Sequence, residues 1–316
     1  MLYNAKIMKC LIIGGGGFVG SWLTKELISR RHEVIVIDPS IYYSDLNVKQ
    51  RKLINEFKRE NLLKDAKVYK KKFEDGGERI LKKEKPDVVI HLAGIPLERA
   101  HDFDISLKQL TDDMGLNYRV IDVVKNNPVK KFIYMSSISA YGDCNAVIDE
   151  EYNLVPKTPY GVMKAGGEFL TRAELDNWNV IRTTNIYGFG DMNGRASNTI
   201  LNKILKGEVF WINKNIMMDF IYVKDLVSGI ADVVLKAPAK ETFHISGNNA
   251  IPLAKFVEVL KKHFQFEYEI KDLHDRPRRG TMNNLKAKKI IGWSPKMDIK
   301  KGLADYIKYV KKYGIA

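Results

Sequence analysis

Cysteine is scarce in this chain, which contains only Cys10 and Cys144 among its 316 residues. The two cysteines lie far apart, and neither belongs to a CxxC pair. The sequence therefore indicates neither a disulfide framework nor a thiolate zinc site. We expect a protein without a metal site, built around an apolar core.

Long hydrophobic runs are also missing. The longest apolar stretches, such as residues 10–13 and 34–37, are far shorter than the roughly 20 residues that cross a bilayer. The only charged residues before the first of these stretches are Lys6 and Lys9. This segment lacks the apolar region and the cleavage site of a signal peptide. We therefore expect no membrane partner and a cytoplasmic location.

Low-complexity tracts and internal repeats are absent as well. Hydrophobic residues make up 45% and charged residues 28% of the chain, as in an ordinary globular protein. The length favours two structural units. The net charge of +14 favours an anionic partner, either nucleic acid, membrane headgroups or a phosphorylated small molecule. Because lysine-rich runs such as 49–58, 70–72 and 308–312 usually form solvated faces, we expect no nucleic-acid partner.

Strand-like and helix-like segments alternate along the first 182 residues. Continuously apolar runs at 9–13, 33–37, 68–73, 87–92, 131–136 and 178–182 are separated by helical spacing at 18–29, 115–125 and 160–174. Such alternation predicts an α/β fold with a doubly wound parallel sheet of the Rossmann type. Runs that are apolar throughout are typical of strands covered on both faces.

The alternation weakens after residue 182, which predicts a second unit. We expect residues 1–182 to form a dinucleotide-binding domain, rejoined by 219–246 through a strand at 220 and the helix after it. Residues 188–198 are expected to form a loop. Residues 183–218 and 247–316 would form a smaller C-terminal α/β substrate-binding domain, with helices at 253–264 and 299–313.

A glycine-rich turn follows the first strand. Residues 14–20 read Gly-Gly-Gly-Gly-Phe-Val-Gly, and they lie between a strand and a helix. Glycines there permit positive φ, a close approach of the backbone to a pyrophosphate and tight packing of the helix on the sheet. Asp38 ends the next strand, where a carboxylate accepts hydrogen bonds from the adenosine ribose and repels a 2′-phosphate. This context predicts NAD as the cofactor.

Tyr160 and Lys164 lie one helical turn apart, on the same face of a predicted helix. A nearby cation favours the ionised form of a phenol, which can then act as a base. Upstream, Ser136 and Ser137 end a strand at the carboxyl edge of the sheet, where open α/β folds bind ligands. The pattern predicts a proton-transfer site. His91, at another strand end, is interpreted as a packed or hydrogen-bonded residue.

Taken in order, these motifs make the chain resemble the extended short-chain dehydrogenase/reductase family, in particular its NAD-dependent nucleotide-sugar epimerases and dehydratases. The similarity covers nearly the whole chain. It rests on the following segments: 17–20, 86–94, Asn117, Ser136-Ser137, Tyr141-Gly142, Tyr160 with Lys164, 185–188, 219–225 and 292–295.

The resemblance implies roles for individual residues. Tyr160 would be the acid/base, Lys164 would hold the nicotinamide ribose, and Ser137 would bind the reacting sugar hydroxyl. The cofactor would contact Gly14, Gly17, Phe18, Val19, Gly20, Asp38, Phe73, Leu92, Ala93, Gly94, Asn117, Tyr160 and Lys164. The sugar nucleotide would contact Ser137, Ser139, Asn185, Arg276 and Arg279.

Departures from the family pattern bear on the reaction. Dehydratases have an Asp-Glu pair after the active-site hydroxyl residue, where this chain has Ile138 and Ser139. A small hydroxyl residue there is similar to the 4-epimerases. Met218 stands where the family commonly has an arginine that grips the diphosphate. In place of the usual Gly-x-Gly turn just before it, the chain has Asn213-Lys214-Asn215, and asparagine also tolerates turns.

The leading hypothesis is an NAD-dependent nucleotide-sugar 4-epimerase that oxidises the sugar transiently at C4. A nucleotide-sugar dehydrogenase or keto-reductase with net redox turnover is the alternative, and a non-catalytic NAD- or RNA-binding relative is a third reading. The helices at 107–125 and after Tyr160 are similar to those of the family's four-helix interface. The resemblance therefore implies a homodimer.

Overall fold

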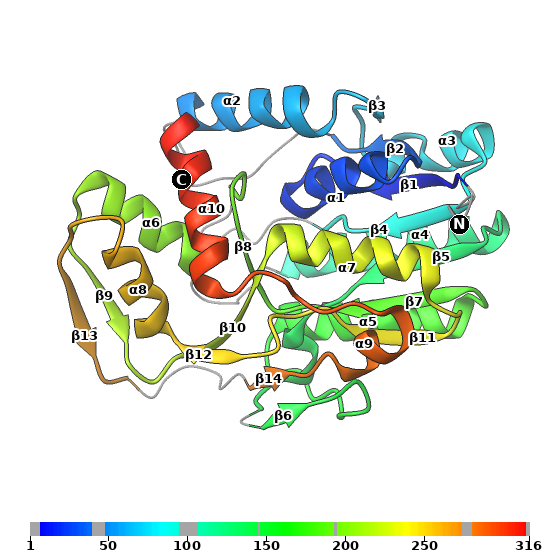
Figure 1. Cartoon of the computed structure of the whole chain (residues 1–316). Helices are drawn as coiled ribbons and strands as arrows, with labels where there is room; N and C mark the ends of the chain where they lie inside the picture. Colours follow the sequence, from blue (N-terminus) through cyan, green and yellow to red (C-terminus); the bar gives the residue numbers. More distant parts are fainter. Residues whose placement is uncertain are drawn as a thin grey trace, which may run out of the picture.

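The structure is a computed structural model, and it describes residues 7–39, 48–94, 107–144, 146–192, 195–273 and 280–313. A sheet of seven strands with order β11-β7-β5-β4-β1-β2-β3 dominates it (Figure 1). All its pairings are parallel. The strands are β1 (Lys9–Ile13), β2 (Glu33–Ile37), β3 (Lys67–Tyr69), β4 (Val88–His91), β5 (Lys131–Met135), β7 (Trp178–Arg182) and β11 (Glu241–His244).

Helices cover both faces of this sheet. On one face, α1 (Phe18–Ser29) packs against α7 (Val223–Lys236); on the other lie α3 (Gly77–Glu84), α4 (Leu107–Asn126) and α5 (Pro159–Glu174). Along β1, Cys10 and Ile12 belong to the first core, whereas Leu11 and Ile13 belong to the second. Because alternate side chains of a strand point to opposite faces, burial on both faces requires the continuous apolar runs. The predicted doubly wound fold is confirmed.

A smaller part of the molecule lies beside the sheet. Figure 1 shows α6, α8, β9 and β13 gathered at one end, with α10 between them and the large sheet. The strands β12, β10 and β8 form one small sheet, and β13 pairs with β9. The bounds are β8 (Asn185–Tyr187), α6 (Ala196–Lys206), β9 (Phe210–Asn213), β10 (Met217–Tyr222), β12 (Ala250–Pro252), α8 (Leu253–Lys261), β13 (Tyr268–Lys271) and α10 (Ile299–Tyr313).

Short elements complete the description. They are α2 (Val48–Phe57), the π-helical turn η1 (Lys58–Leu62), the 3₁₀ turns η2 (Phe73–Asp75) and η3 (Ile138–Tyr141), the strand pair β6 (Val147–Ile148) and β14 (Thr281–Met282), and α9 (Leu285–Ile291). Within the described ranges, no helix is long and apolar enough to cross a bilayer.

Several local expectations need correction. The strand at 220, β10, pairs with β8 in the small sheet, so residues 219–246 return to the large sheet only through α7 and β11. The expected loop at 188–198 is too long, because α6 begins at Ala196. The third strand ends at Tyr69 rather than 73, and Phe73, its expected last residue, instead begins η2. Lys58 does not belong to a solvated face, since its side chain is buried.

Candidate active site

A cavity of about 1270 Å³ opens along the carboxyl ends of the large sheet's strands. Its lining includes Gly14 after β1, Asp38 after β2, Leu92 after β4 and Ser136 after β5. The opposite wall comes from α6, β9 and β10. The cavity therefore lies between the two parts of the molecule, at the sheet edge where doubly wound folds bind ligands.

The glycine loop forms the cofactor side of this cavity. Gly14 has φ of +85°, and a Cβ there would lie 2.7 Å from the backbone nitrogen of Ala93. A Cβ on Gly20 would lie 2.3 Å from the carbonyl oxygen of Gly14, so helix α1 can approach the loop only without side chains. Gly17, Phe18, Val19 and Gly20 line the cavity. A bare backbone at the start of a helix fits a pyrophosphate, as NAD requires.

Asp38 adjoins this loop. Its carboxylate accepts a hydrogen bond from the Gly16 amide at 3.0 Å, and its side chain lines the cavity. The acceptor is thereby fixed at the end of β2, where it fits the hydroxyls of an adenosine ribose. Phe73 and Lys72 line the cavity beyond it, as do Leu92, Ala93 and Gly94. Every expected cofactor residue except Asn117 therefore lines the cavity.

Lys58 supports the loop from beneath. It is 2% exposed, and its ammonium group lies 3.4 Å from the carbonyl oxygen of Gly16. Burial lowers the pKa of Lys58 to about 8, although attraction to Asp191 and Asp38 opposes that shift. The cation therefore sits among the glycine loop and two carboxylates.

Tyr160 lies in the first turn of α5. Thr158 caps this helix, its hydroxyl accepting the Gly161 amide hydrogen at 3.1 Å, and Pro159 begins it. A Cβ on Gly161 would lie 2.3 Å from the carbonyl oxygen of Ser139. The glycine therefore lets the helix touch η3. As a result, half-buried Tyr160 and the hydroxyl residues before η3 face the same cavity.

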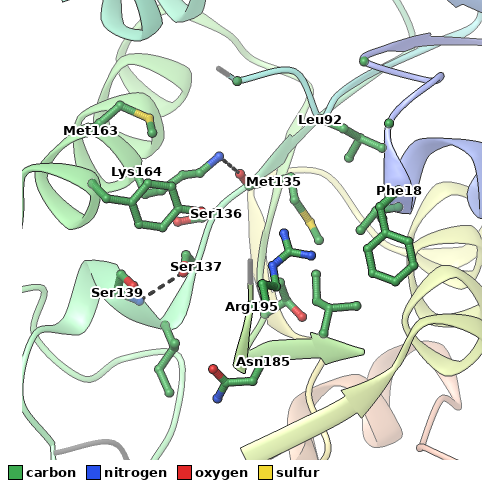
Figure 2. Close-up of a pocket in the computed structure, with 18 of the residues that line it drawn as sticks. Phe18, Leu92, Met135, Ser136, Ser137, Ser139, Met163, Lys164, Asn185 and Arg195 are labelled. Atoms are coloured by element: carbon green, nitrogen blue, oxygen red, sulfur yellow. Dashed lines mark hydrogen bonds between the residues drawn. The ribbon is translucent and has the colours of Figure 1, made fainter. Parts of the chain in front are cut away.

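Lys164 extends from α5 across the end of β5. Its ammonium group donates to the carbonyl oxygen of Met135 at 3.0 Å and lies 5.8 Å from the ring centre of Tyr160. The Ser137 hydroxyl accepts the Ser139 amide hydrogen at 3.1 Å. Figure 2 shows both bonds as dashed lines, with Asn185 on a neighbouring segment. Ser137, Ser139, Tyr160, Lys164 and Asn185 all line the cavity.

A buried ionic network lies behind this group. Glu168, one turn beyond Lys164 on α5, accepts hydrogen bonds from the Ser136 hydroxyl and from the guanidinium of Arg182. Glu168 is 0% and Arg182 2% exposed. These contacts connect α5, the end of β5 and β7. They lie next to Ser137, because Ser136 immediately precedes it. A buried pair of this kind is destabilising to break.

His91 and Asn117 do not reach the cavity lining. A ring nitrogen of His91 lies 2.9 Å from the side-chain oxygen of Asn117, whose amide group donates to the Tyr134 hydroxyl at 3.3 Å. Burial, followed by repulsion from Lys164, lowers the pKa of His91 to about 3. The interpretation of His91 as a hydrogen-bonded core residue is confirmed. Asn117 holds His91 and Tyr134 together beneath the site.

Two expected substrate residues, Arg276 and Arg279, lie outside the described residues. Leu273, the last described residue before them, does line the cavity. Its carbonyl oxygen accepts hydrogen bonds from the side-chain amides of Asn213 at 2.8 Å and Asn215 at 3.1 Å. Asn213 and Asn215 therefore fix the position of Leu273 at the cavity.

Sequence reasoning overlooked part of the lining. Arg195, the N-cap residue of α6, lines the cavity together with Thr199 and Lys203 of that helix, and Trp211 does so from β9. Arg195, Thr199 and Lys203 are spaced four residues apart, as on one face of a helix. This spacing could have identified them, but residues 188–198 were expected to form a loop.

A known protein family matches most of this chain. The model described as the NAD dependent epimerase/dehydratase family matches residues 10–246. The chain belongs to the NAD-dependent epimerase/dehydratase family. The expected enzyme class, the extended short-chain dehydrogenase/reductase type and the NAD cofactor are thereby confirmed.

Members of the family with similar sequences or structures include both epimerases and dehydratases. An uncharacterized UDP-glucose epimerase of Bacillus subtilis is 27% identical, covering 96% of this chain and 98% of its own. The structure of UDP-glucose 4-epimerase from Thermotoga maritima with UDP-glucose is 28% identical, with a TM-score of 0.78 and coverage of 96% and 99%. UDP-glucuronic acid 4-epimerase from Bacillus cereus with NAD shares the fold at 22% identity, with a TM-score of 0.83 and the same coverage. Several dTDP-glucose 4,6-dehydratases also match.

Proposed function

We propose that this protein is an NAD-dependent nucleotide-sugar 4-epimerase. The observation that carries the proposal is the convergence of Ser137, Tyr160 and Lys164 on one cavity whose turn after Ser137 bears no carboxylate. The names of its relatives make a UDP-sugar the first substrate class to test.

Each reacting group would have one task. The Tyr160 phenolate would take the proton from the sugar's C4 hydroxyl, while Ser137 would hydrogen-bond that hydroxyl and orient it. Lys164, whose ammonium lies 5.8 Å from the phenol ring centre, would stabilise the phenolate and hold the cofactor's ribose. When bound, NAD would supply reversible hydride transfer at C4. Once the keto-sugar had rotated so that the opposite face of C4 met the hydride, Tyr160 would return the proton to the C4 oxygen.

Dehydration is disfavoured by the same cavity. Eliminating water requires an acid and a base beside the sugar. The carboxylates that line the cavity within the described part of the chain are Asp38, Glu74 and Asp112, and none belongs to η3. Ile138, in the place of the dehydratase aspartate, is buried in an apolar cluster, and Ser139 provides only a hydroxyl.

The decisive experiment combines cofactor analysis with isotope tracing. The purified protein is incubated with UDP-, dTDP-, GDP- and ADP-sugars deuterated at C4, and products are identified by NMR and mass spectrometry. We expect a C4 epimer that retains the deuterium, formed without an added redox partner.

Tyr160→Phe is expected to retain bound NAD and to lose at least about 100-fold in kcat, the scale of a lost acid/base. Undiminished turnover in this variant would contradict the mechanism. Transfer of deuterium to an added acceptor would favour the dehydrogenase or keto-reductase alternative.

A further inference from the structure

Away from the glycine loop, none of the described residues of β9 and β10 that line the cavity is a cation. Met218, on β10, lines the cavity at the position where the resemblance expects an arginine that grips a diphosphate. A thioether is only a weak acceptor and offers no N–H to a phosphate. If a diphosphate binds here, a positive charge must come from another element.

Helix α6 supplies such charge from the facing wall. Arg195, Thr199 and Lys203 recur every four residues and all line the cavity. The other face of α6 is apolar, with Ile200, Leu201 and Ile204 buried in the core. The helix is therefore oriented so that its basic side chains point toward the space that a ligand would fill.

Arg195 is held in place before any ligand arrives. Its guanidinium donates to the Asp191 carboxylate at 2.8 Å, and the Asp191 side chain is 2% exposed whereas that of Arg195 is 38% exposed. The guanidinium lies 5.8 Å from the ring centre of Phe18. Figure 2 shows Arg195 among the pocket-lining side chains, with Phe18 and Asn185 also drawn. A fixed arginine loses little conformational entropy on binding a ligand.

The ion pair with Asp191 leaves most of the Arg195 guanidinium available. Asp191 also attracts the buried ammonium of Lys58, which Asp38 attracts as well. A guanidinium has five N–H donors, and the bond to Asp191 employs one of them. Arg195 can therefore present both charge and paired donors to a phosphate.

We infer that Arg195, anchored by Asp191, binds the diphosphate of the sugar nucleotide and takes over the task of the arginine missing at position 218. The inference rests on the proposed function, because it names the anion-binding residue of that same site. It predicts that the nucleotide lies along α6 rather than along β10.

Binding measurements on the intact, NAD-loaded protein test this assignment. UDP, UDP-glucose and uridine are titrated by calorimetry into the wild type, Arg195→Met, Arg195→Lys and the control Lys206→Met, which removes an exposed charge from the same helix outside the cavity. Arg195→Met should weaken UDP and UDP-glucose about 10- to 100-fold and leave uridine unchanged. Arg195→Lys keeps the charge and should lose less, and Lys206→Met should match the wild type.

A second-site change sharpens the test. Met218→Arg introduced into Arg195→Met should recover at least part of the UDP affinity; no recovery would overturn the claim that Arg195 replaces that arginine. Unchanged UDP affinity in Arg195→Met, or loss of NAD rather than UDP, would overturn the inference alone. A wild-type protein that binds none of the UDP-, dTDP-, GDP- or ADP-sugars would overturn the proposed function as well.

Discussion

At the scale of single residues, two histidines are held in the neutral form inside the protein. Burial lowers the pKa of both His91 and His244 to about 3, and nearby cations, Lys164 and Arg182 respectively, act in the same direction. Each ring is hydrogen-bonded, His91 to Asn117 and His244 to Tyr141. Neither histidine lines the cavity, so their effect is on stability.

The sign of this effect follows from proton linkage. Because the folded pKa lies below the unfolded value of about 6.5, the histidines stabilise the fold fully above that pH, and the stabilisation is lost as the pH falls toward 3. Each contributes up to about 1.4 kcal/mol per pH unit in this window. We expect the free energy of urea unfolding to fall less steeply between pH 6.5 and 5 in His91→Gln than in the wild type. Equal slopes would contradict the assignment.

Asp219 explains why the comparison must be made between variants. Burial raises the pKa of Asp219 to about 7, above the value of an unfolded aspartate. Its contribution is therefore present at low pH and is lost as the pH rises through 7, which opposes the histidines. The difference between two proteins that share Asp219 removes this opposing effect.

At the scale of elements, two glycines, Gly161 and Gly167, allow α5 to lie close to its neighbours. Gly161 allows contact with the carbonyl oxygen of Ser139, and a Cβ on Gly167 would lie 2.1 Å from the Tyr134 hydroxyl. Lys164 and Glu168 then bind the consecutive residues Met135 and Ser136 of the adjacent strand end. The helix is thus fixed along its length relative to Ser137.

Replacing a glycine of α5 should therefore cost more than replacing one of α4. Gly161→Ala forces the helix off η3, and we expect a loss of about 1–3 kcal/mol in unfolding free energy together with a lower kcat. In the control Gly115→Ala the new Cβ meets nothing within 4 Å, so better helix propensity should stabilise by up to about 1 kcal/mol. Urea unfolding measures the stability of both variants, and initial rates measure kcat. Unchanged stability and kcat in Gly161→Ala would contradict the prediction.

Sequence patterns predicted these elements unevenly. The strands at 9–13, 33–37 and 178–182 each place apolar side chains in the cores on both faces of the sheet, and their predicted bounds agree with the structure. The start of α6 was missed because Gly188 to Asn198 is rich in turn-forming residues. Lys58 was misplaced because its burial depends on Asp38 and Asp191, which are distant in sequence and adjoin it only after folding. Arg195 was missed although its partner Asp191 lies only four residues earlier, because the cavity that Arg195 lines forms only after folding.

At the scale of the whole molecule, α4 and α5 pack together and present apolar side chains to solvent. Tyr118 is 59%, Val162 49% and Phe169 56% exposed. Exposed aromatic residues on neighbouring helices are typical of protein interfaces. We propose that this face joins two copies of the chain, as the resemblance to the family implies.

Light scattering during size-exclusion chromatography tests the dimer. We expect twice the 36.2 kDa mass of one chain for the wild type and a single-chain mass for Phe169→Glu, because a carboxylate cannot be desolvated cheaply at the interface. Val209→Glu, at a site 66% exposed outside these helices, is the matched control and should remain dimeric. A monomeric wild type would refute the proposal.

The route of the chain through the large sheet has a consequence for biosynthesis. Strand β11 supplies one edge of that sheet, and α7 covers α1, although both are encoded after the segments that build the second wall of the cavity. During translation, Trp22 and Leu23 of α1 must therefore wait for α7 to emerge before their core is complete. A nascent chain paused before α7 would expose apolar surface and an unpaired strand edge on β7, the two features that promote aggregation.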